Sequence, residues 1–252
     1  MKKLEILYLC EDLLDFDGTR GDMLYFLSQL EARNIAYTLT KHQTTEKISV
    51  SNYDFIYAGV VPQKYEKLYL SALKENISDL NTYIDSGKVM LAIEQSFLFL
   101  CKSITEGEYL NFLPYTIVKE ANYTIGNILL DVNIVGENGK KFKSKINGFV
   151  NSRYHVSIPN KEKFGKIRLG QGYFWESMQE GAVYKGLIGT QLRGPILPRN
   201  FDLCNYIIEQ ITKKELAPID NLLEKKAKEQ LTADCQRFID SGEQKKEYTY
   251  IS

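Results

Sequence analysis

The sequence predicts an α/β fold in which a parallel β-sheet is flanked by helices, with an antiparallel insertion and C-terminal helices. Over residues 4–103, short apolar segments alternate with segments of helical periodicity, which is typical of parallel strands covered on both faces. Further along, strand-like segments follow one another, joined by turns such as Glu137-Asn138-Gly139. This second pattern is typical of antiparallel strands.

The first half of the chain supplies the alternating pattern. We expect strands at residues 4–10, 35–40, 53–59 and 89–93, and helices at residues 23–33, 64–86 and from 97 to 103. Leu24, Leu27 and Leu30 recur at helical spacing in the first helix, and Asp22 stands at its N-cap position. Gly87 ends the second helix.

The second half supplies the insertion and the last helices. We expect strands at residues 115–119, 128–135, 141–149 and 167–169, and helices at residues 200–212 and 219–239. The last helix is highly charged, and it packs on this domain or on a partner through an apolar stripe of Leu222, Leu223, Ala227 and Leu231. The chain is expected to form one domain, residues 1–240, with a loose tail at residues 241–252.

Composition excludes several classes of protein. Lys and Arg number 32 and Asp and Glu number 32, so the net charge is zero, which argues against a nucleic-acid-binding surface. No apolar run approaches the roughly 20 residues that cross a bilayer, and the N-terminus lacks the apolar core of a signal peptide. We therefore expect a cytoplasmic protein that neither spans nor binds a membrane.

Metal and cofactor sites are not expected. The four cysteines are scattered and are read as reduced, mostly buried thiols: Cys10, Cys101, Cys204 and Cys235. The two histidines are isolated, and no phosphate-binding glycine loop is present. His42 lies in a polar loop where we expect it to be solvated, and the role of His155, a displaced base or a structural residue, stays open.

Residues 186–200, Gly-Leu-Ile-Gly-Thr-Gln-Leu-Arg-Gly-Pro-Ile-Leu-Pro-Arg-Asn, are the most informative segment. The segment resembles the histidine-bearing motif of class I glutamine amidotransferases, whose fold is flavodoxin-like. Within that family it resembles the cobyric acid synthase branch, which includes the amidotransferase subunit of lipid II isoglutaminyl synthase. There the motif is Gly-Thr-x-Leu-His-Gly-Pro-x-Leu-Pro-x-Asn, and the histidine activates a cysteine. Arg193 takes that place here, and an arginine keeps its proton at neutral pH.

Residues 93–100, Ile-Glu-Gln-Ser-Phe-Leu-Phe-Leu, resemble the family's nucleophile turn, Cys-Gly-Gly-aromatic-x-Phe-Leu, which follows a strand. The resemblance puts Glu94 in the place of the cysteine, and Gln95 and Ser96 in the places of the two glycines. A carboxylate is a poor nucleophile against an amide. Cys101 lies further along, and we read it as a packed core thiol.

The remaining pocket residues follow from the same resemblance. The family's Gly-Gly-Gly oxyanion turn corresponds to Gly59, Val60 and Val61, and β-branched residues resist the positive φ angles that such a turn uses. Tyr123 takes the place of an arginine that holds the α-carboxylate of glutamine. Asn151 is retained, its neighbour is Ser152 in place of a histidine, and Gln171 lies in a Gly-x-Gly element.

Glu94 and Arg193 have opposite charges, so we expect them to form an ion pair that fills the former active site. The alternative is that Glu94 binds a cationic ligand or acts as a base.

The resemblance implies a catalytically degenerate subunit that works beside a Mur-ligase-like, ATP-dependent amidating protein in cell-wall precursor amidation, as one half of a heterodimer. Two alternatives stay open: an active amidotransferase with a non-standard site, and a module that binds a small, glutamine-like molecule in the pocket. Whether the chain is an enzyme stays open as well.

Overall fold

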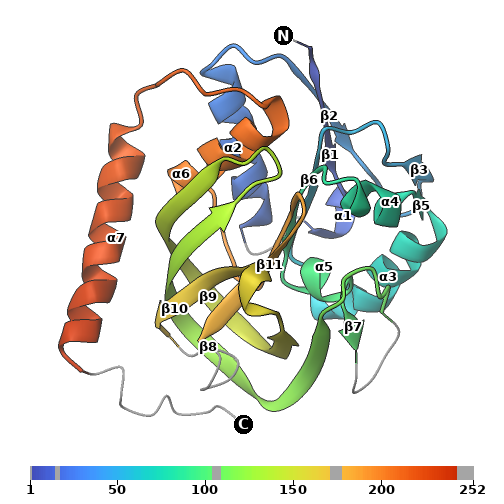
Figure 1. Cartoon of the computed structure of the whole chain (residues 1–252). Helices are drawn as coiled ribbons and strands as arrows, with labels where there is room; N and C mark the ends of the chain where they lie inside the picture. Colours follow the sequence, from blue (N-terminus) through green and yellow to red (C-terminus); the bar gives the residue numbers. More distant parts are fainter. Residues whose placement is uncertain (1, 15–17, 104–108, 171–177, 243–252) are drawn as a thin grey trace.

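The computed structural model describes residues 2–14, 18–103, 109–170 and 178–242. Within these residues a large mixed β-sheet is flanked by helices, which confirms the predicted fold class (Figure 1). Five parallel strands form one side of the sheet, in the order β2 (Tyr37–Lys41), β1 (Leu4–Tyr8), β4 (Phe55–Ala58), β6 (Val89–Ile93) and β12 (Leu187–Thr190).

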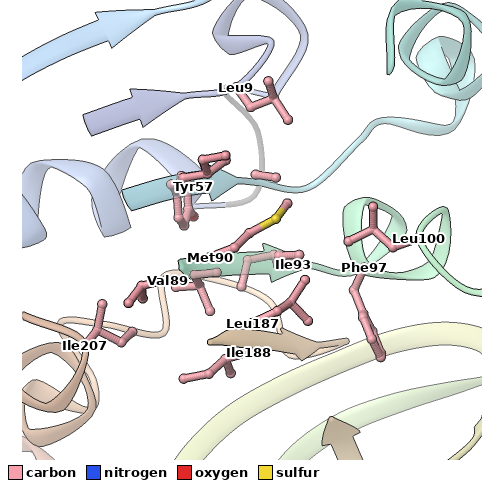
Figure 2. Close-up of a cluster of buried hydrophobic side chains, with 14 of the residues drawn as sticks. Leu9, Tyr57, Val89, Met90, Ile93, Phe97, Leu100, Leu187, Ile188 and Ile207 are labelled. Atoms are coloured by element: carbon pink, nitrogen blue, oxygen red, sulfur yellow. The ribbon is translucent and has the colours of Figure 1, made fainter. Parts of the chain in front are cut away.

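The centre of the sheet is buried because β4, β6 and β12 consist of apolar or small residues that face packed elements on both sides. Figure 2 shows Met90 and Ile93 of β6 beside Leu187 and Ile188 of β12, within one apolar cluster. Gly189 allows the close approach of the next layer, because a Cβ atom there would lie 2.0 Å from the ring of Phe97.

The antiparallel insertion continues the sheet beyond β12. Its strands are β11 (Gln179–Tyr184), β10 (Lys163–Leu169), β8 (Thr116–Val135) and β9 (Lys141–Ser157), and β7 (Lys102–Ser103) runs parallel to the start of β8. The two strands expected at residues 115–119 and 128–135 are parts of β8, whose pairing with β9 shifts register between Lys119 and Thr124. The short 3₁₀ turn η2 (Asn160–Glu162) joins β9 to β10.

The helices partly match the expected ranges. The helices that match are α2 (Thr19–Glu31), α6 (Phe201–Thr212) and α7 (Leu222–Asp240). Helix α1 (Glu11–Leu14) was not expected, and α5 (Gln95–Leu98) is a single turn that ends earlier than predicted. The continuous helix expected at residues 64–86 is wrong. That region contains η1 (Gln63–Tyr65), α3 (Glu66–Glu75), β5 (Ile77–Ser78) and α4 (Leu80–Asp85).

The break after α3 has a local cause. The side-chain amide of Asn76 donates a hydrogen bond to the carbonyl of Thr44, and β5 pairs with β3 (Ile48–Ser49). Asp79 then adopts a φ of 66°, a left-handed conformation that a continuous helix does not contain.

Two residue assignments are corrected by the structure. Asp22 does not cap α2, which begins earlier, at Thr19; instead its side chain points into the interior and is buried. His42 is buried and not solvated, because its Nδ1 accepts a hydrogen bond from the backbone N–H of Cys10 and its Nε2 bonds to the carbonyl of Glu46.

Helix α7 lies along the outside of the antiparallel strands (Figure 1). Its inner face makes polar contacts: Lys228 contacts Ser144 and Asp202, and Thr232 accepts a hydrogen bond from Asn147. Most of the predicted apolar stripe does not pack on this domain, since Leu222, Leu223 and Ala227 are exposed, and Leu231, although 39% exposed, lines a cavity between α7 and the antiparallel strands. None of the described helices has the length and apolar character that crossing a membrane requires.

Candidate functional site

Glu94 sits on a sharp turn between β6 and α5, at the carboxyl end of a central strand. Its φ of 52° and ψ of −118° are costly for a residue with a side chain, and such strain is typical of a nucleophile turn. The backbone holds the turn firmly: the N–H of Glu94 donates to the carbonyl of Thr190 at 2.7 Å, and its carbonyl accepts from Phe97 and Leu98 at 2.9 Å each.

The Glu94 carboxylate is paired with Arg193. Oε1 of Glu94 accepts a hydrogen bond from Nε of Arg193 at 2.9 Å and a second one from Nη2. The side chain of Glu94 is 1% exposed and that of Arg193 is 20% exposed. The ion pair expected from the sequence is therefore present and lies mostly inside the protein.

The segment that carries Arg193 is fixed at its start by a buried carboxylate, Glu180 on β11. Glu180 accepts hydrogen bonds from the hydroxyl of Thr190 at 2.8 Å and from the backbone N–H of Gln191 at 2.7 Å. Burial raises the pKa of Glu180 to about 7, although both hydrogen bonds oppose the shift. The Arg193 N–H donates to the carbonyl of Phe149, which ties the segment to β9.

The end of the same segment is fixed by Asp22. Its carboxylate accepts hydrogen bonds from the N–H of Leu197 at 2.6 Å and from the hydroxyl of Tyr57 at 3.0 Å. Burial raises the pKa of Asp22 to about 7, against the effect of these donors. Sequence reasoning missed both Asp22 and Glu180 as supports of the site, because nothing in their immediate neighbours indicates burial.

The loop after β4 is also tied down. The backbone N–H of Val60 donates to the hydroxyl of Thr19 at 3.1 Å, and the hydroxyl of Ser96 donates to the carbonyl of Gly59 at 2.6 Å. A Cβ atom at Gly59 would lie 2.0 Å from the methyl group of Thr19, so the loop approaches α2 closely. The Val60 N–H thus already has an acceptor within the protein.

A pocket of about 250 Å³ opens above the ion pair. Seven of the predicted site residues line it: Val60, Val61, Glu94, Gln95, Tyr123, Asn151 and Arg193. Gly59 and Ser96 are absent from its lining, and Gln171 lies outside the described residues. Sequence reasoning did not assign to the pocket a further set of lining residues, Gln63, Glu66, Arg153 and Tyr154.

Larger cavities, of about 330, 530 and 290 Å³, lie elsewhere among the described residues. The chemistry of the 250 Å³ pocket, with its strained turn and ion pair, makes it the candidate site despite its smaller volume.

Other reactive groups do not reach this pocket. Burial raises the pKa of the Cys101 thiol far above its usual range, and its Sγ donates to the carbonyl of Phe97. His155 is missing from the pocket lining, and burial lowers its pKa to about 4. All four cysteines are free thiols, and Cys10, Cys101 and Cys204 are buried, as expected. No group of three potential metal ligands occurs among the residues that the structure describes.

Comparison with known proteins gives two curated relatives and matching solved structures. The chain is 28% identical over 250 positions to the GatD subunit of the glutamine-hydrolysing lipid II isoglutaminyl synthase of Staphylococcus aureus, covering 94% of this chain and 98% of that protein. It is 25% identical over 222 positions to the subunit of the same name from Streptococcus pneumoniae, covering 84% of this chain and 82% of that protein. No family model matches the chain.

Solved structures agree on the fold. The PurLQS structure from Thermotoga maritima matches with a TM-score of 0.54 at 12% identity, covering 84% of this chain and 98% of that one. A glutamine amidotransferase from the same organism matches with a TM-score of 0.52 at 14% identity, covering 96% of this chain and 98% of that one. The chain therefore has the α/β fold of glutamine amidotransferases and is similar over most of its length to GatD subunits.

Proposed function

We propose that this chain is a glutamine amidotransferase-like subunit that does not hydrolyse glutamine, and that it works in the cytoplasm as the non-catalytic partner of a Mur-ligase-like protein in lipid II amidation. The similarity to the two GatD subunits supports the context. The Glu94–Arg193 ion pair carries the proposal of lost catalysis.

The ion pair opposes glutaminase chemistry in two ways. Glutamine hydrolysis of this class needs a nucleophile that forms an acyl intermediate and a base that activates it. Glu94 is a carboxylate whose Oε1 is held by two donors of a guanidinium, which lowers its reactivity further. Arg193 has no lone pair to accept a proton at neutral pH.

The loop after β4 supports the same conclusion. Stabilising a tetrahedral intermediate needs backbone N–H groups that point at its oxyanion. The N–H of Val60, at the position predicted for that role, donates to Thr19. Catalysis through a displaced site is disfavoured as well, because Cys101 is buried with a raised pKa and His155 lies outside the pocket lining.

The test is a glutamate-release assay on the purified chain, alone and together with a Mur-ligase-like protein encoded beside it. We expect no release above the no-protein background in either case, and we expect the two proteins to co-elute as a heterodimer. Amidation by the complex should then require free ammonium. Glutamate release that disappears in Cys101→Ala or His155→Ala would establish the active alternative and overturn the proposal.

A further inference from the structure

The lining of the 250 Å³ pocket contains, besides the Glu94–Arg193 pair, two opposite charges that are not paired with each other. Glu66, at the start of α3, and Arg153, on β9, both line the pocket, and no ion pair joins them. The guanidinium of Arg153 lies over the ring of Tyr123, 5.2 Å from its centre, which restrains its position. Glu66 makes no ion pair or hydrogen bond with another described side chain, and burial raises its pKa even though Arg153 and Lys119 lower it.

A third group points to a ligand with hydrogen-bond donors. The Oε1 atom of Gln95 is buried and has no hydrogen-bond partner among the described residues. A buried acceptor without a donor costs free energy, which a ligand N–H group would recover. Gln95 lines the same pocket as Glu66, so the acceptors for a cationic group and the donor for an anionic group share one cavity.

The size and floor of the pocket restrict the ligand further. Its volume is below the roughly 300–1,000 Å³ typical of sites for drug-sized molecules. The lining includes the Glu94–Arg193 pair, whose charges cancel, and Val60 and Val61 add apolar surface. These walls suit a short side chain without charge.

We propose that this pocket binds a free α-amino acid with a short, uncharged side chain, its carboxylate on Arg153 and its ammonium group on Glu66 and Gln95. The proposal rests on the proposed loss of catalysis, since the ligand is held and not consumed.

The experiment is isothermal titration of the full chain with L-serine, ethanolamine and 3-hydroxypropionate. The last two lack the carboxylate and the amine respectively, and each should bind at least about tenfold more weakly than L-serine, because one charge-assisted contact is lost. L-glutamine, whose longer side chain meets the ion pair, should bind more weakly than L-serine. No heat with L-serine up to about 10 mM, equal binding of the two analogues, or tighter binding of L-glutamine would overturn the proposal.

Variants separate the two charged ends. Arg153→Gln should weaken L-serine at least about tenfold without weakening ethanolamine, whereas Glu66→Gln should weaken L-serine without weakening 3-hydroxypropionate. A merely structural effect would lower all affinities together and contradict the assignment. Lys64→Gln is the matched control, since Lys64 stacks on Tyr65 and is absent from the pocket lining. Glutamate release from L-glutamine would refute the lost catalysis and leave the L-serine result standing on its own.

Discussion

Glu94 and Arg193 lie 99 residues apart in the sequence, and one carboxylate oxygen of Glu94 accepts hydrogen bonds from two nitrogens of the Arg193 guanidinium. The contact joins the end of β6 to the segment after β12, which are neighbours in the sheet. Because both residues line the pocket, removal of the pair tests both the stability of the fold and the chemistry of the site.

Breaking the pair should destabilise the protein strongly. Glu94→Ala leaves the guanidinium without its partner, and Arg193→Ala leaves a buried carboxylate, so each should cost about 3–5 kcal/mol in the free energy of unfolding. The double variant should cost less than the sum of the two, as measured by urea unfolding. The exposed pair Lys185–Asp85 is the control, and Lys185→Ala should have a far smaller effect. Additive losses at Glu94 and Arg193 would contradict a direct interaction.

The strained turn makes a second prediction. Glycine adopts a φ of 52° and ψ of −118° at lower cost than alanine, so Glu94→Gly should be more stable than Glu94→Ala by about 1 kcal/mol. The neighbouring Gln95 is helical, so Gln95→Ala should be more stable than Gln95→Gly by about 0.5–1 kcal/mol. Chemical denaturation of the four variants measures both differences, and the same order at both positions would rule out strain at Glu94.

Restoring the chemistry should need more than the two reacting residues. Glu94→Cys with Arg193→His supplies a nucleophile and a base, but the Val60 N–H still donates to Thr19. Adding Thr19→Ala frees that donor, and one oxyanion contact is worth about 10²–10³ in kcat. We therefore expect the triple variant to release glutamate at least about tenfold faster than the double variant. Equal rates, or no activity in either, would show that Thr19 does not limit the site.

The buried carboxylates predict how stability depends on pH. Burial raises the pKa of Asp22 from 3.8, and that of Glu180 from 4.5, to about 7, so the folded protein holds these protons more tightly than the unfolded chain. The protonated carboxyl groups therefore stabilise the folded state. This stabilisation is complete below about pH 4, and about 3–4 kcal/mol of it is lost for each group as the pH rises through 7.

Unfolding free energies measured between pH 5 and 8 should therefore fall as pH rises. Glu180→Gln should remove the part of this pH dependence that comes from Glu180. Glu5→Gln, at a half-buried position on β1, is the control and should leave the pH dependence unchanged. A free energy of unfolding that rises with pH over this range would contradict the assigned shifts.

Strand β6, which leads to Glu94, was predictable because its side chains are apolar and its neighbours are turn-forming, whereas β11 and β12, which lead to Arg193, were not among the expected strands. Residues 89–93 form β6 with the predicted bounds, and the motif at residues 186–200 led to the Glu94–Arg193 contact. The break in the helix at residues 64–86 was not predictable, because it depends on Asn76 meeting a distant carbonyl of Thr44. Long-range hydrogen bonds of this kind leave no periodic signal in the sequence.

The carboxylates of Asp22 and Glu180 and the inner face of α7 illustrate the same limit. Each carboxylate is supported by backbone N–H groups that the fold brings to it from another part of the chain. Helix α7 shows a stripe of leucines in sequence, yet Leu222 and Leu223 are exposed and the hydrogen bonds to the domain come from Lys228 and Thr232. The helical spacing of the leucines therefore identified an apolar face of α7, but it did not show whether this face packs on the domain or is exposed.

The hydrogen bonds around Gly59 have a mechanical consequence. Ser96 holds the turn after β6 to the loop after β4, and Thr19 holds that loop to the first turn of α2. Two hydrogen bonds thus connect three stretches from distant parts of the chain. A protein that docks against the beginning of α2 would therefore contact an element that is only two hydrogen bonds away from the turn that carries Glu94.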